Sequence, residues 1–222
     1  MRALALWVHG HLDPSESLLE LLFGLVMAFT MTAGARLLSA PSEIAAGELA
    51  VALLGCNVAW GVIDGALYLL GTLFNRNRRR QFVRQLQAAP DEAAAFAMIE
   101  TEFDLADEPA VRPERKADFH AALLAMLSNA GTRRAGLRRD DLIAALLIAV
   151  LVSAAAVPGI AALLLIADVQ AALAIANFVQ IGLLFLMGYG WAHYTGANPW
   201  HAGLVISLVS LALTLVAVAL GG

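Results

Sequence analysis

The sequence predicts an all-α polytopic membrane protein with five transmembrane helices and a charged helical segment between the second and the third. Two observations carry this prediction. Of the 222 residues, 60% are hydrophobic and 14% are charged, and the mean hydropathy is +0.75, whereas soluble domains are nearer half apolar and a quarter charged. The apolar residues also occur in blocks of about twenty or more, the length that a helix needs to cross a bilayer.

The blocks that meet this length set the predicted spans. They cover residues 18–38, 48–74, 140–166, 169–193 and 201–222. Turn-forming residues separate the first span from the second at 39–42 and the fourth from the fifth at 195–199. Asp168 and Gln170 interrupt the apolar run between the third and fourth spans.

The charges predict the domain organisation and the orientation. Of the 14 Lys and Arg residues, 12 lie between positions 76 and 139. We therefore predict two spans in residues 1–75, a charged helical cytoplasmic domain in 76–139 and three spans in 140–222. The positive-inside rule then puts the N-terminus in the cytoplasm and the C-terminus on the opposite side, with Arg36 as the one charge against this orientation. The expected location is the bacterial inner membrane.

The charged domain itself has the pattern of two or three helices. A basic helix is expected over residues 78–87, and Asp91 after Pro90 is typical of a new helix start. A further helix is expected over 114–128 because its apolar residues recur at helical spacing.

The single cysteine, Cys56, excludes a disulfide framework.

A carboxylate inside the second span is the clearest candidate for function. Asn57, Gly61, Asp64 and Tyr68 follow each other at steps of four, three and four, so they share one helix face. A charged side chain in a span costs about 2.5–3.5 kcal/mol on insertion scales, which makes it a functional hypothesis by default. This row predicts a transport pathway for a cation; the alternative is that Asp64 is protonated or bonded to another helix and fixes packing.

Other spans carry weaker candidates for the same pathway. Asn177 and Gln180 share one face of the fourth span, where pathway lining and ordinary helix–helix hydrogen bonding are equally compatible with the pattern. Met27 and Met31 lie one turn apart in the first span and offer soft ligands to a transition metal. Core packing is the alternative role for both methionines, and the pattern favours it.

The charged domain offers a second candidate site, for a divalent metal ion. Its proposed ligands are Glu100, Glu102, Asp104 and His120, because carboxylates and an imidazole suit iron(II), manganese or zinc. The alternative is a solvated helix face. No phosphate-binding glycine loop, nucleophile elbow or HExxH motif is present. We therefore expect no enzyme activity, no permanently bound cofactor and no nucleic-acid partner.

The order of the segments resembles the vacuolar iron transporter family, whose members export iron and manganese. Residues 23–34 (FGLVMAFTMTAG) are similar to that family's first-helix signature, and residues 154–158 (AAAVP) to its proline-containing third helix. The resemblance implies the same fold and a homodimer. Phe23 stands where that family carries an ion-binding aspartate, so Asp64 and Asn57 are the expected replacements here.

Two functions follow as hypotheses. The first is export of a divalent metal ion, iron or manganese, from the cytoplasm as the transported substrate. The second is a non-transporting membrane scaffold or accessory protein that retains the transporter fold. A transporter should require Asp64, whereas a scaffold should tolerate asparagine at that position.

Overall fold

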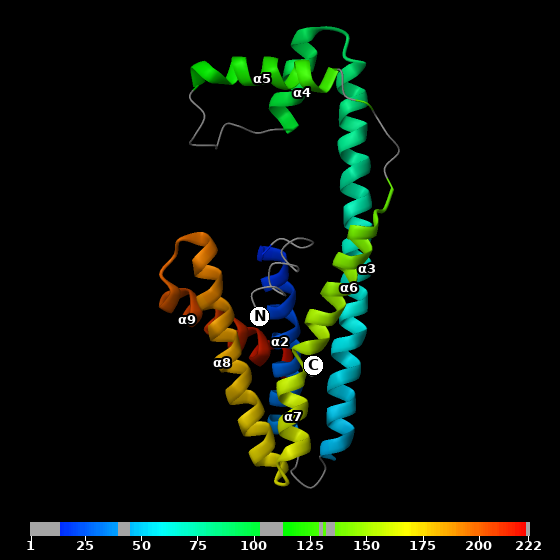
Figure 1. Ribbon diagram of the computed structural model, residues 1–222. Coiled ribbons are helices and arrows are strands. Elements are labelled where there is room, and N and C mark those ends of the chain that lie inside the picture. The colour runs from blue at the N-terminus through cyan, green and yellow to red at the C-terminus, as the bar shows by residue number, and fades with distance from the viewer. Residues whose placement is uncertain (1–13, 40–44, 103–112, 129–130, 132–135, 221–222) are drawn as a thin grey trace. The chain divides into compact units, whose positions relative to one another are not determined.

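The computed structural model describes residues 14–39, 45–102, 113–128, 131 and 136–220. These residues form helices joined by short connections (Figure 1), which confirms the all-α fold class. In chain order the helices are α2 (Pro14–Leu38), α3 (Ala46–Gln87), α4 (Glu92–Glu102), α5 (Pro113–Ser128), α6 (Arg139–Ala154), α7 (Val157–Leu165), α8 (Val169–Thr195) and α9 (Pro199–Ala219).

Five helical stretches among these residues are long and apolar enough to cross a membrane. They are Ser17–Leu38, Ala46–Gln87, Arg139–Leu165, Val169–Thr195 and Pro199–Ala219. The third comprises α6 and α7 together, and α4 and α5 lie between the second and third spans. The five predicted spans are therefore confirmed, and the chain is a polytopic membrane protein whose surroundings include a lipid bilayer.

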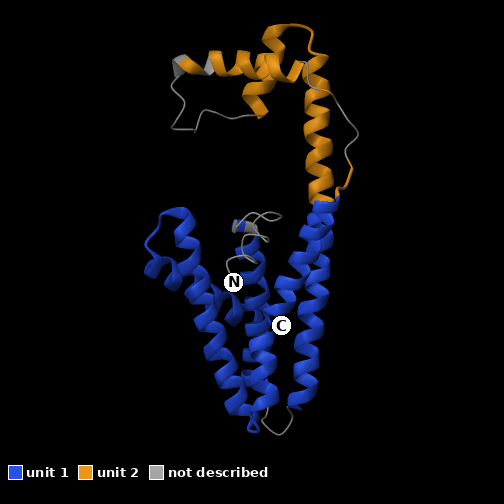
Figure 2. Cartoon of the chain, in the orientation of Figure 1, with its two compact units in different colours: residues 1–69, 139–222 blue, residues 70–138 orange. Residues whose placement is uncertain are grey.

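The chain divides into two compact units (Figure 2). The transmembrane unit comprises residues 1–69 and 139–222, and the polar unit comprises residues 70–138. Helix α3 begins in the first unit and ends in the second, without interruption at the point where its composition becomes basic. Residues 78–87, expected as a separate helix, are thus the last turns of α3.

The transmembrane unit is built around α2, which packs against α6, α8 and α9. Its core is made largely of alanine and leucine, including the fully buried Ala28, Leu53, Ala156 and Leu173. The small alanine side chains let helix backbones approach closely, which favours the van der Waals packing that contributes to helix association in a bilayer.

Local sequence explains where the last two spans begin and end. Asp168 caps α8 by accepting a hydrogen bond from the Ala171 N–H at 2.7 Å. Gly196 ends α8 with a left-handed backbone, φ 70°, which glycine adopts without steric cost. Asn198 caps α9, and Pro199 occupies the first turn, where its missing N–H costs no hydrogen bond.

The third span is broken at Ala155 and Ala156, between α6 and α7. Pro158 has no N–H, so it cannot bond the carbonyl four residues earlier, and its ring disfavours a continuous helix. The Ala156 N–H donates to the Ser153 carbonyl at 3.2 Å, three residues back instead of four. The Val152 carbonyl is thereby left without its usual helical donor.

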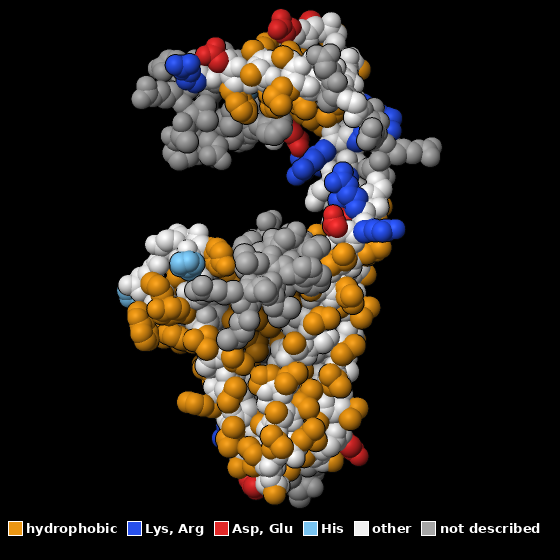
Figure 3. Space-filling model, in the orientation of Figure 1, with side chains coloured by type: hydrophobic (Ala, Val, Ile, Leu, Met, Phe, Trp, Pro, Cys, Tyr) orange, Lys and Arg blue, Asp and Glu red, His pale blue; other side chains and the backbone are white. Residues whose placement is uncertain are grey.

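The outer surface of the transmembrane unit suits lipid. Large apolar side chains stand exposed along α3, α6, α8 and α9, among them Val51, Leu146, Phe178 and Leu215. Figure 3 shows hydrophobic side chains covering the visible face of this unit, with few charges among them. Such a surface would aggregate in water and is stable against lipid tails.

The polar unit has a small core of its own. Leu86 of α3 packs with Ala95 and Ile99 of α4, and all three are buried. The Asp91 carboxylate accepts a hydrogen bond from the Ala94 N–H at 2.8 Å, so it caps the start of α4. Apolar residues of α5, including Leu123, complete this core.

Candidate functional site

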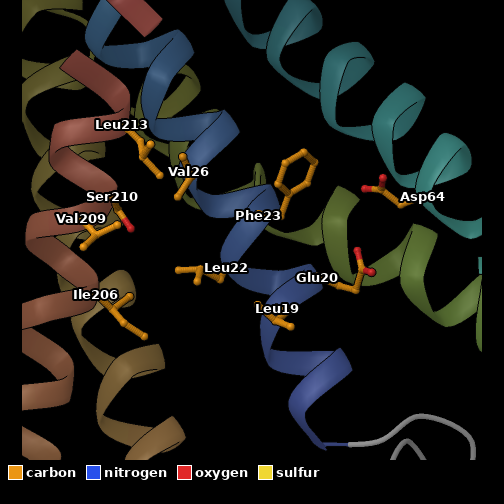
Figure 4. Close-up of a pocket in the computed structure, with 10 residues that line it drawn as sticks. All are labelled: Leu19, Glu20, Leu22, Phe23, Val26, Asp64, Ile206, Val209, Ser210 and Leu213. Carbon is orange, nitrogen blue, oxygen red and sulfur yellow. The ribbon is translucent and has the colours of Figure 1, made fainter. Parts of the chain in front are cut away.

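A cavity of about 530 Å³ lies within the transmembrane unit, between α2, α3 and α9. Its walls are mainly leucine, isoleucine, valine and phenylalanine side chains. Three lining residues are polar: Asp64 from α3, Glu20 from α2 and Ser210 from α9. In Figure 4 the Asp64 carboxylate points from α3 toward α2. Candidate ligands for a cation therefore line a largely apolar space.

Asp64 carries the strongest feature of this cavity. The residue is half-buried, and its Oδ2 atom is buried without a hydrogen-bond partner among the described residues. A buried, unpaired carboxylate oxygen is costly in a low-dielectric environment. A bound cation or a proton would remove that cost.

Glu20 lies at a depth similar to that of Asp64. Asp64 comes 18 residues after Ala46, where α3 begins, and Glu20 comes 18 residues before Leu38, where α2 ends. At 1.5 Å per residue, each is about 27 Å along its helix from the connection between the two. The sequence did not single out Glu20 as a candidate, although this residue lies within the predicted first span, 18–38.

Two glycines fix the orientation of α3 around Asp64. A Cβ atom at Gly61 would lie 2.7 Å from the Ala149 carbonyl oxygen, and one at Gly65 would lie 2.6 Å from that of Ala145. Both distances are shorter than a van der Waals contact, so the backbones of α3 and α6 meet here directly. This contact holds one face of α3 against α6 and leaves Asp64, at the margin of that face, directed into the cavity (Figure 4).

Asn57 links three elements and makes no contribution to the cavity lining. Its Nδ2 atom donates to the Gly24 carbonyl at 3.1 Å and to the Val152 carbonyl at 2.9 Å. Val152 is the residue whose carbonyl is released by the break in the third span. Both amide protons are therefore used to join α2, α3 and α6, and these contacts favour the structural interpretation of Asn57. Its Oδ1 atom has no hydrogen-bond partner among the described residues.

Gln180 and Asn177 are buried on α8. Gln180 pairs with Thr32 of α2 at 2.8 Å between Oε1 and Oγ1, and its Nε2 lies near Gly159 of α7, where an added Cβ would be 3.1 Å away. Asn177 is buried on the same helix. Neither amide lines the cavity that holds Asp64. The Thr32–Gln180 contact is one the sequence did not indicate.

The remaining pathway candidates pack against helices. Tyr68 packs against the buried cluster of α6 that contains Ile148. Met31 packs against the core that contains Leu53. Met27 is half-buried, and neither methionine lines the cavity. The structure thus places Met31 where packing accounts for it.

The metal candidates of the polar unit lie in different surroundings. Glu100 and Glu102 are both exposed, and Glu102 accepts a charged hydrogen bond from Arg78 at 2.6 Å. His120 is buried beside the rings of Phe96 and Phe119. Asp104 lies outside the described residues. Within the described part of the chain, no three His, Cys, Asp or Glu side chains are close enough together to hold a metal ion.

Comparison with known proteins adds no family assignment. The sequence matches no protein-family model, and no curated protein is significantly similar to it.

Proposed function

We propose that the protein is a membrane transporter that exports a divalent metal ion, iron or manganese, from the cytoplasm. The observation that carries the proposal is the half-buried Asp64 carboxylate, with an unpartnered buried oxygen, in a cavity between spans. Intramembrane carboxylates that face an internal space are typical of ion pathways. Oxygen ligands without a thiol suit iron(II) and manganese better than copper(I).

The proposed orientation follows from the distribution of charge. Both flanks of the polar unit are rich in arginine, so the positive-inside rule puts this unit and the N-terminus in the cytoplasm and the C-terminus on the opposite side. Export then runs from the membrane face at which α3 enters the polar unit. Within the predicted spans 18–38 and 48–74, Glu20 and Asp64 lie in the halves that are nearer this face.

A homodimer is part of the same proposal. The spans of α3 and α9 are the least covered by the rest of the chain. In the most apolar 18-residue stretch of each, 22% is buried, against 39% in the other three spans. Both helices line the cavity. A second copy packed on them would narrow the cavity and add ligands from its own chain, which matters because manganese and iron(II) commonly take more oxygen ligands than two carboxylates supply.

The alternative is a non-transporting scaffold or accessory protein of the same fold. The apolar character of the cavity walls is the observation that favours it, because Asp64, Glu20 and Ser210 are the polar residues among those lining it. In this case Asp64 would be held protonated and would contribute to packing alone. Asparagine at this position would then be tolerated.

Metal flux into proteoliposomes tests the two functions against each other. The purified protein is reconstituted and uptake of manganese, iron(II) and zinc is measured for the wild type, for Asp64→Asn and for the control Asp168→Asn. Asp168 is an exposed helix cap, and asparagine caps helices equally well. We expect flux in the wild type and in the control and none in Asp64→Asn. Wild-type flux that survives in Asp64→Asn would place the pathway elsewhere, and the absence of flux in the wild type would favour the scaffold.

A further inference from the structure

The cavity beside Asp64 is far larger than a metal ion needs. Its volume is about 530 Å³, and sites for drug-sized organic molecules typically measure about 300–1,000 Å³. Ten described residues line the cavity, and seven of them have apolar side chains. An ion held by Asp64 would use one side of this space and leave the apolar walls without a role.

The charge and a large apolar wall lie on opposite sides of α2. In Figure 4, α3 carries Asp64 on one side of α2, and α9 carries Ile206, Val209 and Leu213 on the other. The side chains of Val209 and Leu213 are 52% and 55% exposed, so this wall is accessible. Because the cavity lies between membrane spans, an apolar molecule can reach it from the lipid tails.

An aromatic pair lies next to Asp64. The Phe23 ring of α2 lines the cavity and meets the Trp60 ring of α3 edge to face, with the ring centroids 6.0 Å apart and the planes at 77°. Trp60 comes one turn before Asp64, so the two side chains are neighbours on the surface of α3. Aromatic rings attract organic cations through the negative charge of their faces. The rings and the carboxylate therefore favour the same kind of ligand.

No cationic side chain of the described residues neutralises Asp64. Lysine, arginine and histidine are absent from the described residues that line the cavity, and Asp64 forms no ion pair within the described part of the chain. Glu20 adds a second carboxylate to the lining. A charge in apolar surroundings is costly unless an opposite charge accompanies it. The cavity thus suits a ligand that brings its own positive charge.

We infer that this cavity binds a lipophilic organic cation, a molecule with one positive charge and an apolar body, taken from the surrounding bilayer. The charge lies beside Asp64 and the ring of Phe23, and the apolar body lies against α2 and α9. Each part of the ligand then meets side chains of matching chemistry. The inference shares Asp64 with the proposed ion site and goes beyond the proposed function, since binding of such a cation requires no metal.

Two probes of the same shape and opposite charge test the inference. Tetraphenylphosphonium is a cation and tetraphenylborate is an anion, so their comparison separates the effect of charge from that of apolar contact. Binding of each probe to the purified full-length protein is measured by equilibrium dialysis without metal, and uptake by protein-free detergent micelles is subtracted. We expect the wild type to bind the cation at least about tenfold more tightly than the anion, because like charges placed together at a binding site cost more than this.

Variants then assign the binding to this cavity. Asp64→Asn should weaken cation binding at least about tenfold, whereas Asp168→Asn, at an exposed cap of α8, should leave it unchanged. Phe23→Ala should weaken cation binding roughly two- to fivefold, as expected for the loss of one cation–π contact. The matched control is Phe178→Ala, which removes an exposed ring of α8 that does not line the cavity and should leave binding unchanged.

Equal affinity of the wild type for the two probes would overturn the inference, as would cation binding that Asp64→Asn leaves unchanged. If Asp64→Asn does not give a monodisperse protein, Phe23→Ala and Phe178→Ala replace it, and equal cation binding by these two variants would contradict the inference. The outcome is separable from that of the flux assay. Metal flux without binding of tetraphenylphosphonium would refute this inference alone, and binding without metal flux would refute the proposed export alone.

Discussion

Alanine in place of Gly61 or Gly65 should destabilise the transmembrane unit, whereas the same change at Gly55 should not. All three glycines lie in α3, so each substitution adds one methyl group to the same helix. A Cβ at Gly61 or Gly65 would approach an α6 carbonyl oxygen to 2.7 or 2.6 Å, whereas a Cβ at Gly55 meets nothing within 4 Å. To reach ordinary contact the two backbones must move apart by more than half an ångström.

The size of the effect follows from two opposing terms. Overpacking of a tight contact costs typically about 1–3 kcal/mol, and glycine-to-alanine replacement in a helix contributes up to about 1 kcal/mol in the stabilising direction. We expect a net loss of up to about 2 kcal/mol for Gly61→Ala and Gly65→Ala, and a neutral or slightly stabilising effect for Gly55→Ala. The separation of α3 from α6 should also shift Asp64 and reduce metal flux.

Thermal unfolding in detergent, followed by circular dichroism and tryptophan fluorescence, measures these differences. The expected order of midpoints is Gly55→Ala at or above the wild type, with Gly61→Ala and Gly65→Ala below it. If Gly61→Ala and Gly65→Ala are as stable as Gly55→Ala, the direct backbone contact between α3 and α6 is refuted, along with the argument that it orients Asp64.

Three further predictions concern other parts of the chain. Asn57→Leu should lower the free energy of unfolding by about 1–2 kcal/mol, because in a span each lost hydrogen bond costs somewhat under 1 kcal/mol and the Val152 carbonyl loses its donor. The thermal unfolding midpoint measures this loss. An unchanged midpoint would argue against a stabilising link through Asn57 between the helices. A reporter fused after Gly222 should report from the side opposite the cytoplasm, and a cytoplasmic signal would reverse the proposed orientation. Manganese should leave the helical signal of the full-length protein unchanged through Glu100 and Glu102, because Glu102 pairs with Arg78 and residues two apart on a helix do not face each other. An increase that the double variant Glu100→Gln, Glu102→Gln abolishes would support the metal site predicted from the sequence instead.

The spans could be predicted from the sequence because a bilayer imposes a length on each apolar block. Turn chemistry placed the later helix ends equally well, since Asp168 and Asn198 cap their helices with their own side chains. The continuation of α3 could not be predicted in this way. A change from apolar to basic residues marks where a helix leaves the membrane, and arginine, glutamine and leucine continue a helix readily.

The candidate site was only partly predictable, because its contacts join residues far apart in the chain. Asp64 stood out by the cost of its charge alone. Asn57 shares the helix face of Asp64 and was predicted to share its role. Its amide instead donates to the Val152 carbonyl, which the break before Pro158 releases, and only the packed structure shows this contact. Glu20 could have been found by counting along the chain from the connection between α2 and α3. Glu20 lies as many residues before the end of α2 as Asp64 lies after the start of α3.

Binding of manganese beside Asp64 tests the proposed ion site directly. The single cysteine, Cys56, lies in the same helix eight residues earlier, or about 12 Å along the axis, and is half-buried. A nitroxide attached there reports a nearby paramagnetic ion through enhanced relaxation. We predict that manganese enhances the relaxation of this label in the wild-type protein and that Asp64→Asn abolishes the enhancement. Equal enhancement in the two proteins, or none in either, would contradict the assignment of Asp64 as the ion site.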